Sequence, residues 1–121
     1  MSERVSEIII TKGKPKPRDE IRFLLLRKCP IEAFGSFACC YFGCLSFAMY
    51  DNEHLGLNGL AISYGGVYAL MTYVFYDITG SHFNPAISFG YFLQGKIDFF
   101  VFMMYMVCHM IGGMIAACFL L

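Results

Sequence analysis

Three long runs with almost no formal charge constrain this chain more than any other feature. They lie at about residues 30–50, 55–77 and 98–121, and Glu32 is the one charge inside them, apart from an aspartate at the end of the second run and another at the start of the third. Each run reaches the roughly 20 residues needed to cross a hydrocarbon core about 30 Å thick. Backbone polar groups in lipid must be satisfied within the segment, so the runs are predicted to be helices although they contain many β-branched and aromatic residues. The sequence therefore predicts an all-α membrane protein with three transmembrane helices.

Charge is distributed unevenly along the 121 residues. The formal net charge is zero, but eight of the nine Lys and Arg residues lie before residue 29, and the ninth is Lys96. Such a basic tail, predicted over residues 1–26, could indicate nucleic-acid binding, yet a chain that is 58% hydrophobic favours a lipid bilayer as the partner. The positive-inside rule then predicts that the tail and the 77–98 region are cytoplasmic, and that the first connection and the C-terminus lie outside. The tail is polar for too long to be a secretory signal peptide.

The six cysteines do not predict a metal site. Zinc sites commonly use paired Cys-x-x-Cys units, which this sequence lacks, and most of the cysteines lie in apolar runs where Cys acts as a small hydrophobe. Neither a disulfide framework nor any cofactor is expected. The cysteines are Cys29, Cys39, Cys40, Cys44, Cys108 and Cys118.

Small residues recur at a spacing of four in each predicted helix. This spacing allows helix backbones to approach closely in membranes, so the small residues are predicted to mark packing faces. The alternative is that small residues are simply frequent in membrane helices. The series are Gly35, Cys39 and Gly43; Gly65 and Ala69; Gly112 and Ala116; and Gly113 and Ala117.

A shorter helix is predicted between the second and third runs. Asn84 followed by Pro85 is typical of a helix start, and Gly95 is a suitable stop. A helix over 85–94 would be about 15 Å long, or half a bilayer core. It could be an interfacial or linker helix in which Asn84 is only a cap. It could instead be a re-entrant segment, whose N-terminus would place a partial positive charge in mid-membrane and oppose cations, including protons.

Three segments together resemble one family. The stretch Thr79–Ser88 resembles the first Asn-Pro-Ala signature of the aquaporin (major intrinsic protein) family, Glu32–Ser36 resembles its first-helix Glu-x-x-Gly-Thr pattern, and Tyr105–Gly113 resembles its third-helix pattern. The resemblance covers residues 27–121. It implies the first of two inverted three-helix repeats, with a re-entrant half-helix, in a passive channel for water or small neutral solutes. It also implies no catalysis, a homotetramer as in the family, and a C-terminal half or a full-length relative as partner.

The resemblance implies roles for the residues around the short helix. Asn84 would donate its side-chain amide to a passing water, and Pro85 and Ala86 would hold two half-helices together. A ladder of carbonyl acceptors would line the cytoplasmic vestibule. Its members would be Gly80, Ser81 and His82, of which Gly80 also suits a sharp inward turn.

Glu32 and His82 would brace the re-entrant loop by hydrogen bonds. Their alternatives are a helix-dipole partner for Glu32 and an ordinary loop histidine for His82, although a carboxylate inside a membrane is costly enough to favour the bracing role. Tyr64 would fall at the aromatic position of the outer selectivity filter, or else be an ordinary interfacial tyrosine.

The sequence also departs from the family pattern. The filter position is more usually Phe, Trp or His, and His109 stands where the third-helix Gln is expected, which puts that residue's hydrogen bond in doubt. The 121 residues contain one Asn-Pro-Ala and no second set of helices, so the expected product is a fragment or half-length channel. The alternative is a non-conducting, truncated subunit that associates with full-length relatives. An enzyme or metal protein is disfavoured because the cysteines and His82 lie on different elements.

Overall fold

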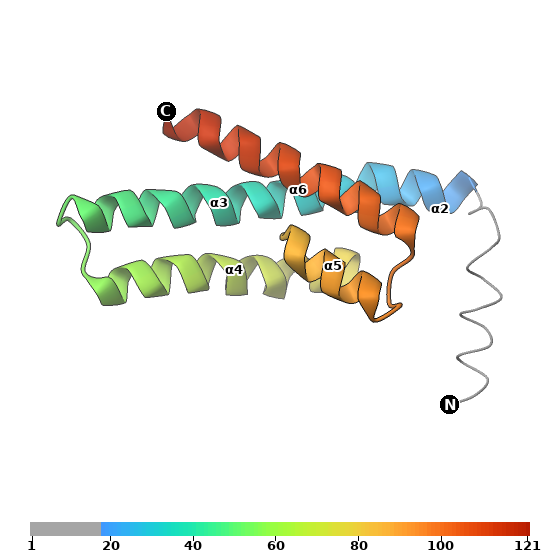
Figure 1. Cartoon of the computed structure of the whole chain (residues 1–121), viewed down its shortest axis with the longest axis horizontal. Coiled ribbons are helices and arrows are strands. Elements are labelled where there is room, and N and C mark those ends of the chain that lie inside the picture. Colours follow the sequence, from blue (N-terminus) through green and yellow to red (C-terminus); the bar gives the residue numbers. More distant parts are fainter. Residues whose placement is uncertain (1–17) are drawn as a thin grey trace.

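A computed structural model describes residues 18–121, and all regular secondary structure in that range is helical (Figure 1). The first 17 residues of the predicted tail lie outside it. The elements are α2 (Arg18–Phe23), the π-helical segment η1 (Leu24–Lys28), α3 (Cys29–Asp51), α4 (Leu57–Thr79), α5 (Pro85–Leu93) and α6 (Phe99–Leu120).

The start of the first helix differs from the prediction. Residues 18–26 were expected to belong to a polar tail, whereas α2, η1 and α3 form one continuous helix of 34 residues, Arg18–Asp51. Asp19 and Glu20 lie in the first turn, where acidic side chains favour the helix dipole. Leu24 is buried in a cluster with Tyr105 of α6. The helix therefore extends into the charged segment because Leu24, which lies within that segment, packs against α6. Composition alone does not reveal this contact.

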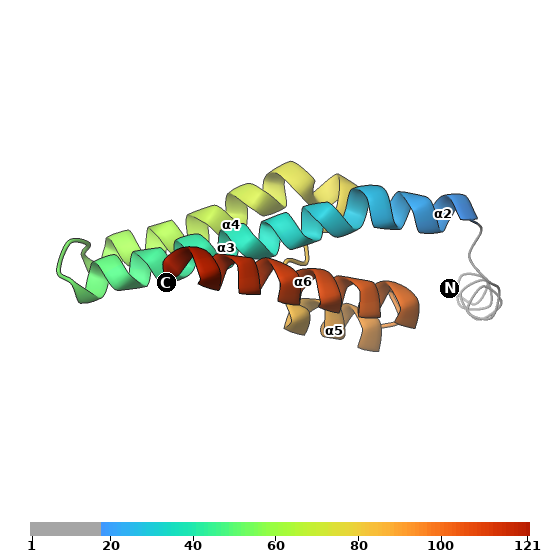
Figure 2. The same cartoon turned by 90° about the horizontal axis from the view of Figure 1, so that it is seen from above.

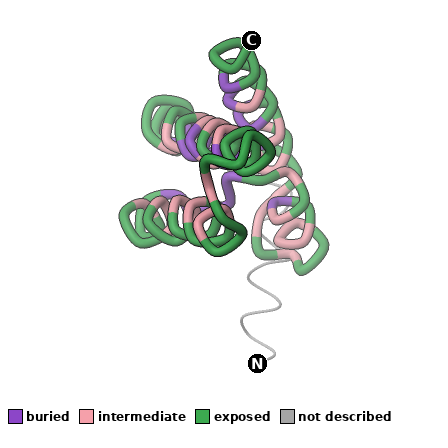
Figure 3. Tube along the Cα trace, turned by 90° about the vertical axis from the view of Figure 1, so that its left-hand side faces the viewer, coloured by how far each residue is buried: buried purple, intermediate pink, exposed green. Residues whose placement is uncertain are grey.

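Helices α4 and α6 both pack against α3. Helix α4 runs back along α3 after a short connection, α6 runs in the same direction as α3, and α5 is a short helix beside the beginning of α6 (Figures 1 and 2). Viewed end-on, buried segments gather where the helices face each other, and the outward surfaces are exposed (Figure 3). Helix α3 thus forms the centre of the assembly.

Two helices are long and apolar enough to cross a membrane, Arg18–Asp51 and Phe99–Leu120. Helix α4 has 23 residues, as α3 does, and contains Asn58, Thr72 and several tyrosines. The predicted crossing by this helix remains a prediction.

The predicted close approach of helix backbones is confirmed at Gly112, and two further predicted positions, Gly35 and Gly43, pack tightly against side chains. A Cβ atom at Gly112 would overlap the backbone carbonyl of Ala33, and one at Gly35 or Gly43 would overlap an aromatic ring. Gly65 differs, because no other atom of the described residues lies within 4 Å of a Cβ placed there. The small residues of α3 and α6 therefore mark close contacts, one of them with Tyr64 of α4, whereas Gly65 of α4 marks none among the described residues.

Candidate functional site

Helix α5 begins with a side-chain cap. Asn84 has extended backbone angles, and its side-chain oxygen accepts a hydrogen bond of 2.9 Å from the backbone N–H of Ala86, while Pro85 occupies the first helical position. The helix ends at Leu93, one residue before the predicted end, and Gly95 follows with a left-handed φ of 70°. Nine residues give a length of about 14 Å.

The chain doubles back between α4 and α5. Tyr68, near the middle of α4, donates a hydrogen bond of 3.1 Å from its hydroxyl to the carbonyl of His82. The Phe83 ring packs edge-on against the Tyr68 ring, with centroids 6.3 Å apart, and fills a notch left by Gly35 of α3. Residues 82–83 therefore lie alongside α4 and α3, and not beyond the end of α4.

Left-handed backbone makes this reversal possible. Gly80 has φ 87°, which glycine adopts freely and which fits its predicted place at the turn. Ser81 and Phe83 have φ near 50°, a conformation that costs other residues free energy and persists only where surrounding contacts hold it. One such contact is the 2.9 Å hydrogen bond from the Ser81 N–H to the Thr79 hydroxyl.

Glu32 of α3 receives the N–H groups of the loop. Its carboxylate is fully buried and accepts hydrogen bonds from the backbone N–H groups of His82 (3.1 Å) and Phe83 (2.7 Å), one on each oxygen. A third bond joins it to Nε2 of His109 at 2.8 Å. Buried carboxylates are tolerated where such donors converge. Glu32 thus lies where the predicted bracing role requires it.

His109 stands where the family pattern has Gln, and it still makes the hydrogen bond to Glu32 that this difference put in doubt. Its side chain is fully buried, and its Nε2 faces Glu32 while the Ser36 hydroxyl donates to its backbone carbonyl at 3.0 Å. A donor on α6 therefore reaches the carboxylate on α3 even though the residue is histidine.

The His82 side chain packs into the protein. Nδ1 lies 2.9 Å from the Ser88 hydroxyl of α5, and the ring packs between Tyr91 and Tyr105, with centroids 4.3 and 5.2 Å away. The imidazole therefore links the loop to both α5 and α6.

Sequence reasoning missed several polar partners of the loop. The Tyr105 hydroxyl donates to the Thr79 carbonyl at 2.8 Å and thereby holds the end of α4 against α6. Tyr68 and Ser88 were missed as well. One signal was available, because Tyr105 and His109 are four residues apart and hence share a face of an otherwise apolar helix.

The predicted pore residues fall into two groups. Asn84 and Ala86 are exposed and Pro85 partly so, whereas Ser81 and His82 are buried and Gly80 is intermediate. Tyr64 does not join them: its ring lies over Gly43, nearer the other end of α4, and 60% of the residue is exposed. The exposed surface at Asn84 could offer an amide to a small polar molecule. Residues 18–121 contain no group of three or more potential metal ligands.

Comparisons with a family model and with individual proteins identify the same family. A model of the family described as major intrinsic protein matches residues 20–121. Aquaporin Z of Photorhabdus laumondii subsp. laumondii is 31% identical over 96 residues, covering 77% of this chain and 42% of the relative. Aquaporin-8 of Rattus norvegicus is 33% identical over 92 residues, covering 76% and 35% respectively. The chain thus spans less than half the length of these relatives. No solved structure matches it significantly.

Proposed function

Because the chain belongs to the major intrinsic protein family, whose channels are not enzymes, we propose that it forms one half of the wall of a passive channel for water or small neutral solutes. The observation that carries this proposal is the position of Asn84. It caps a half-length helix, the residues just before it are held beside α3 by Glu32 and beside α4 by Tyr68, and Asn84 itself is exposed.

In this proposal α5 is a re-entrant half-helix and α3, α4 and α6 cross the bilayer. The polar turn at residues 80–83 can lie at membrane depth because Glu32, Tyr68 and Thr79 satisfy much of its backbone. The positive end of the α5 dipole would then oppose cations, including protons, at the pore. Asn84 would donate its amide to a passing water, with Pro85 and Ala86 against the opposing half-helix.

These contacts determine which carbonyl oxygens of residues 80–82 remain free to accept hydrogen bonds from water. The His82 carbonyl already accepts the Tyr68 hydroxyl, so only its second lone pair is free for water. Gly80 and Ser81 would supply the other acceptors. Tyr64 would contribute to a separate, outer constriction, since it is not adjacent to the loop.

The orientation follows from charge. Arg18, Arg22, Arg27 and Lys28 lie near the start of the first helix, and under the positive-inside rule they support a cytoplasmic position for this end and an outer position for the connection at 51–54. Cysteine substitutions at position 2 and in the 51–54 connection test this with membrane-impermeant maleimides. Labelling of both from the same side would contradict it.

In a bilayer, the exposed side of α4 and α5 would have to contact another protein segment. If the bilayer alone met it, Asn84 and the loop carbonyls would face hydrocarbon, at a cost of several kcal/mol for each unsatisfied group. A second copy in the same orientation cannot supply an inverted repeat, and the basic tail resists inversion. An aquaporin C-terminal half, continuous with the chain or separate, is the covering that fits.

Osmotic swelling of proteoliposomes tests the function. Residues 1–121 alone should give no water flux above the lipid background, and co-reconstitution with an aquaporin C-terminal half should restore flux. Selective flux from the 121-residue chain alone would contradict the need for a second half.

The second candidate is a non-conducting subunit that associates with full-length relatives. The exposed side of α4 and α5 favours it as much as it favours a channel half. It predicts stable association with a full-length aquaporin in detergent, without any gain of flux in the complementation experiment.

A further inference from the structure

Two cysteines that make none of the loop's hydrogen bonds lie in one buried cluster in the protein interior. Cys29 is the first residue of α3 and Cys108 lies on α6; both are free thiols and both are 7% exposed. Both residues belong to the buried cluster that also contains Leu24 and Tyr105. The proposed channel function uses neither thiol.

The packing of α3 and α6 brings these residues close. Cys29 precedes Ala33 by four residues and Cys108 precedes Gly112 by four, so the two pairs are successive contacts along helices that run in the same direction (Figure 1). At the Ala33–Gly112 contact the backbones approach so closely that a Cβ on Gly112 would overlap the Ala33 carbonyl. Disulfides need Cα atoms about 4.4–6.8 Å apart, and such separations arise where helices pack at small residues.

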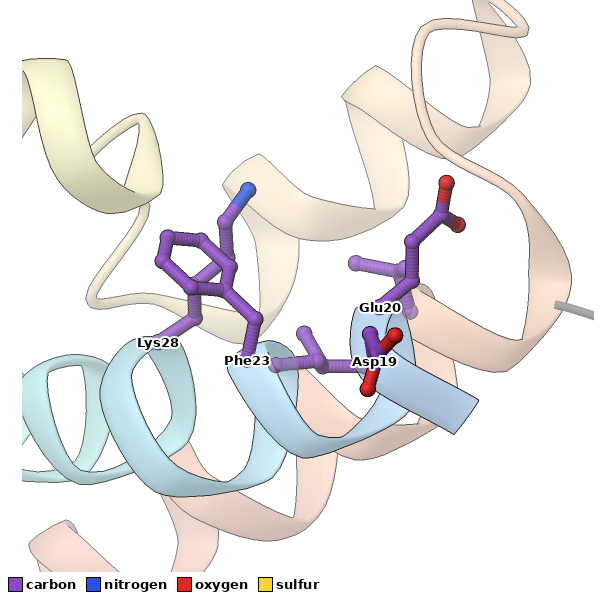
Figure 4. Close-up of a pocket in the computed structure, with 6 residues that line it drawn as sticks. Asp19, Glu20, Phe23 and Lys28 are labelled. Atoms are coloured by element: carbon purple, nitrogen blue, oxygen red, sulfur yellow. The ribbon is translucent and has the colours of Figure 1, made fainter. Parts of the chain in front are cut away.

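A cavity borders the cluster that holds the thiols. It has a volume of about 400 Å³ and lies at the charged end of the molecule, where Asp19 and Glu20 are near the helix start and Phe23 and Lys28 lie further along (Figure 4). Its other two lining residues, Leu24 and Val101, also pack in the cluster that holds Cys29 and Cys108. The cavity and the thiols therefore share Leu24 and Val101 as neighbours.

We propose that Cys29 and Cys108 form a redox-sensitive pair that hydrogen peroxide or another small hydroperoxide converts to a disulfide. One thiol, after losing its proton, attacks a peroxide oxygen; the O–O bond breaks, and a sulfenic acid forms together with water, or with an alcohol where the oxidant is an organic hydroperoxide. The sulfur of the second thiol attacks the sulfenic sulfur, the S–S bond forms, and a water leaves with the remaining proton. Each sulfur loses one electron, and the peroxide is reduced by two.

The disulfide would lie next to the hydrogen bonds by which Glu32 holds the loop and contacts His109. Cys29 lies three residues before Glu32, and Cys108 directly precedes His109. The bond would fix the beginning of α3 to α6 beside the Glu32–His109 contact. This inference does not depend on conduction, because it concerns the packing of α3 and α6 alone.

Peptide mapping of the full 121-residue chain tests the proposal. The reduced protein in detergent micelles is treated with hydrogen peroxide, free thiols are blocked with N-ethylmaleimide, and digests are analysed by mass spectrometry. We expect a peptide pair joining Cys29 to Cys108, with the loss of two hydrogens, that dithiothreitol separates. Methionine oxidation adds oxygen instead and is distinguished in the same map.

Variants supply the controls. Cys29→Ser and Cys108→Ser should each abolish the linked peptide, whereas Cys118→Ser, at an exposed position, should leave its yield unchanged. Oxidation of the exposed cysteines without any Cys29–Cys108 link in the wild-type chain would overturn the proposal. The wild-type map decides even if a serine variant fails to fold.

Discussion

Helices α6 and α4 are almost equal in length and both pack against α3, but they do so differently. Helix α6 buries Tyr105, Cys108, His109, Gly112 and Ala116, whereas only Thr79, its last residue, is buried on α4. Exposure along α4 reaches 89% at Tyr73. The packing of α6 against α3 is therefore extensive within this chain, while α4 leaves most of its surface for lipid or another protein segment.

The polar contacts follow the same division. Glu32, His109, Tyr105 and the loop join α3 to α6 through buried hydrogen bonds. Helix α4 contributes to this network chiefly through Tyr68 and its final turn. Changes at the α3–α6 contact should therefore affect folding, and matched changes on α4 should not.

The largest effect is expected from Glu32→Gln. Glu32 accepts three buried hydrogen bonds, and Gln puts an N–H donor in place of one carboxylate oxygen, so one or two of the facing donors lose their acceptor at about 1–3 kcal/mol each. We expect unfolding in detergent, followed by circular dichroism, to show a loss of this order. In a complemented channel the amount of inserted protein should fall before selectivity changes, and His82→Ala should act in the same way.

Glu20→Gln is the matched control, since Glu20 is an exposed carboxylate on α2. It should change stability by less than about 0.5 kcal/mol. Normal folding of Glu32→Gln together with altered selectivity would mean that Glu32 acts on the solute and does not brace the loop.

Gly112→Leu tests the comparison by packing alone. The new side chain would collide with the Ala33 backbone, and overpacking of this kind typically costs about 1–3 kcal/mol, or more where backbone must shift. The same substitution at Gly65 meets open space and should be tolerated. Equal destabilisation of the two variants, measured by unfolding in detergent, would show that α4 is as closely packed as α6.

Tyr105→Phe isolates one hydrogen bond. It removes the hydroxyl that donates to the Thr79 carbonyl and leaves that carbonyl without this donor, so a loss of about 1–2 kcal/mol is expected. Tyr73→Phe makes the identical change on the exposed face of α4 and should be neutral within about 0.5 kcal/mol. If both variants unfold alike, the end of α4 is not held by Tyr105.

The same division explains what could be predicted from sequence. The bounds of α5 follow from local signals, namely the Asn84 cap, Pro85 and Gly95, and long apolar runs identify α3 and α6. Local signals cannot reveal a contact made across the fold. The Phe83 ring over Gly35 and the Tyr68 hydroxyl on the loop depend on a left-handed turn whose shape is fixed by residues about fifty positions away.

The helical start at Arg18 was missed for a related reason. Composition marks residues 18–28 as a charged tail, but one face of this segment carries Leu24, which is buried with Tyr105 of α6. Packing against a distant helix therefore outweighed the local charge. His109 gives a second example of what sequence patterns do not reveal. It differs from the residue that the family pattern expects, yet it still provides a hydrogen-bond donor to Glu32.

The smallest effect is expected from His109→Gln, and it separates hydrogen bonding from charge. Gln can offer an amide N–H to Glu32 in place of Nε2, and its carbonyl oxygen replaces Nδ1, which is buried without a hydrogen-bond partner among residues 18–121. Either side chain therefore leaves one buried acceptor unsatisfied while it keeps the donor to Glu32, so the net change should stay below about 1 kcal/mol. His109→Ala lacks any donor and should destabilise the chain more. If Gln is as damaging as Ala in detergent unfolding, Glu32 requires the positive charge of a protonated His109, and the contact between α3 and α6 is an ion pair.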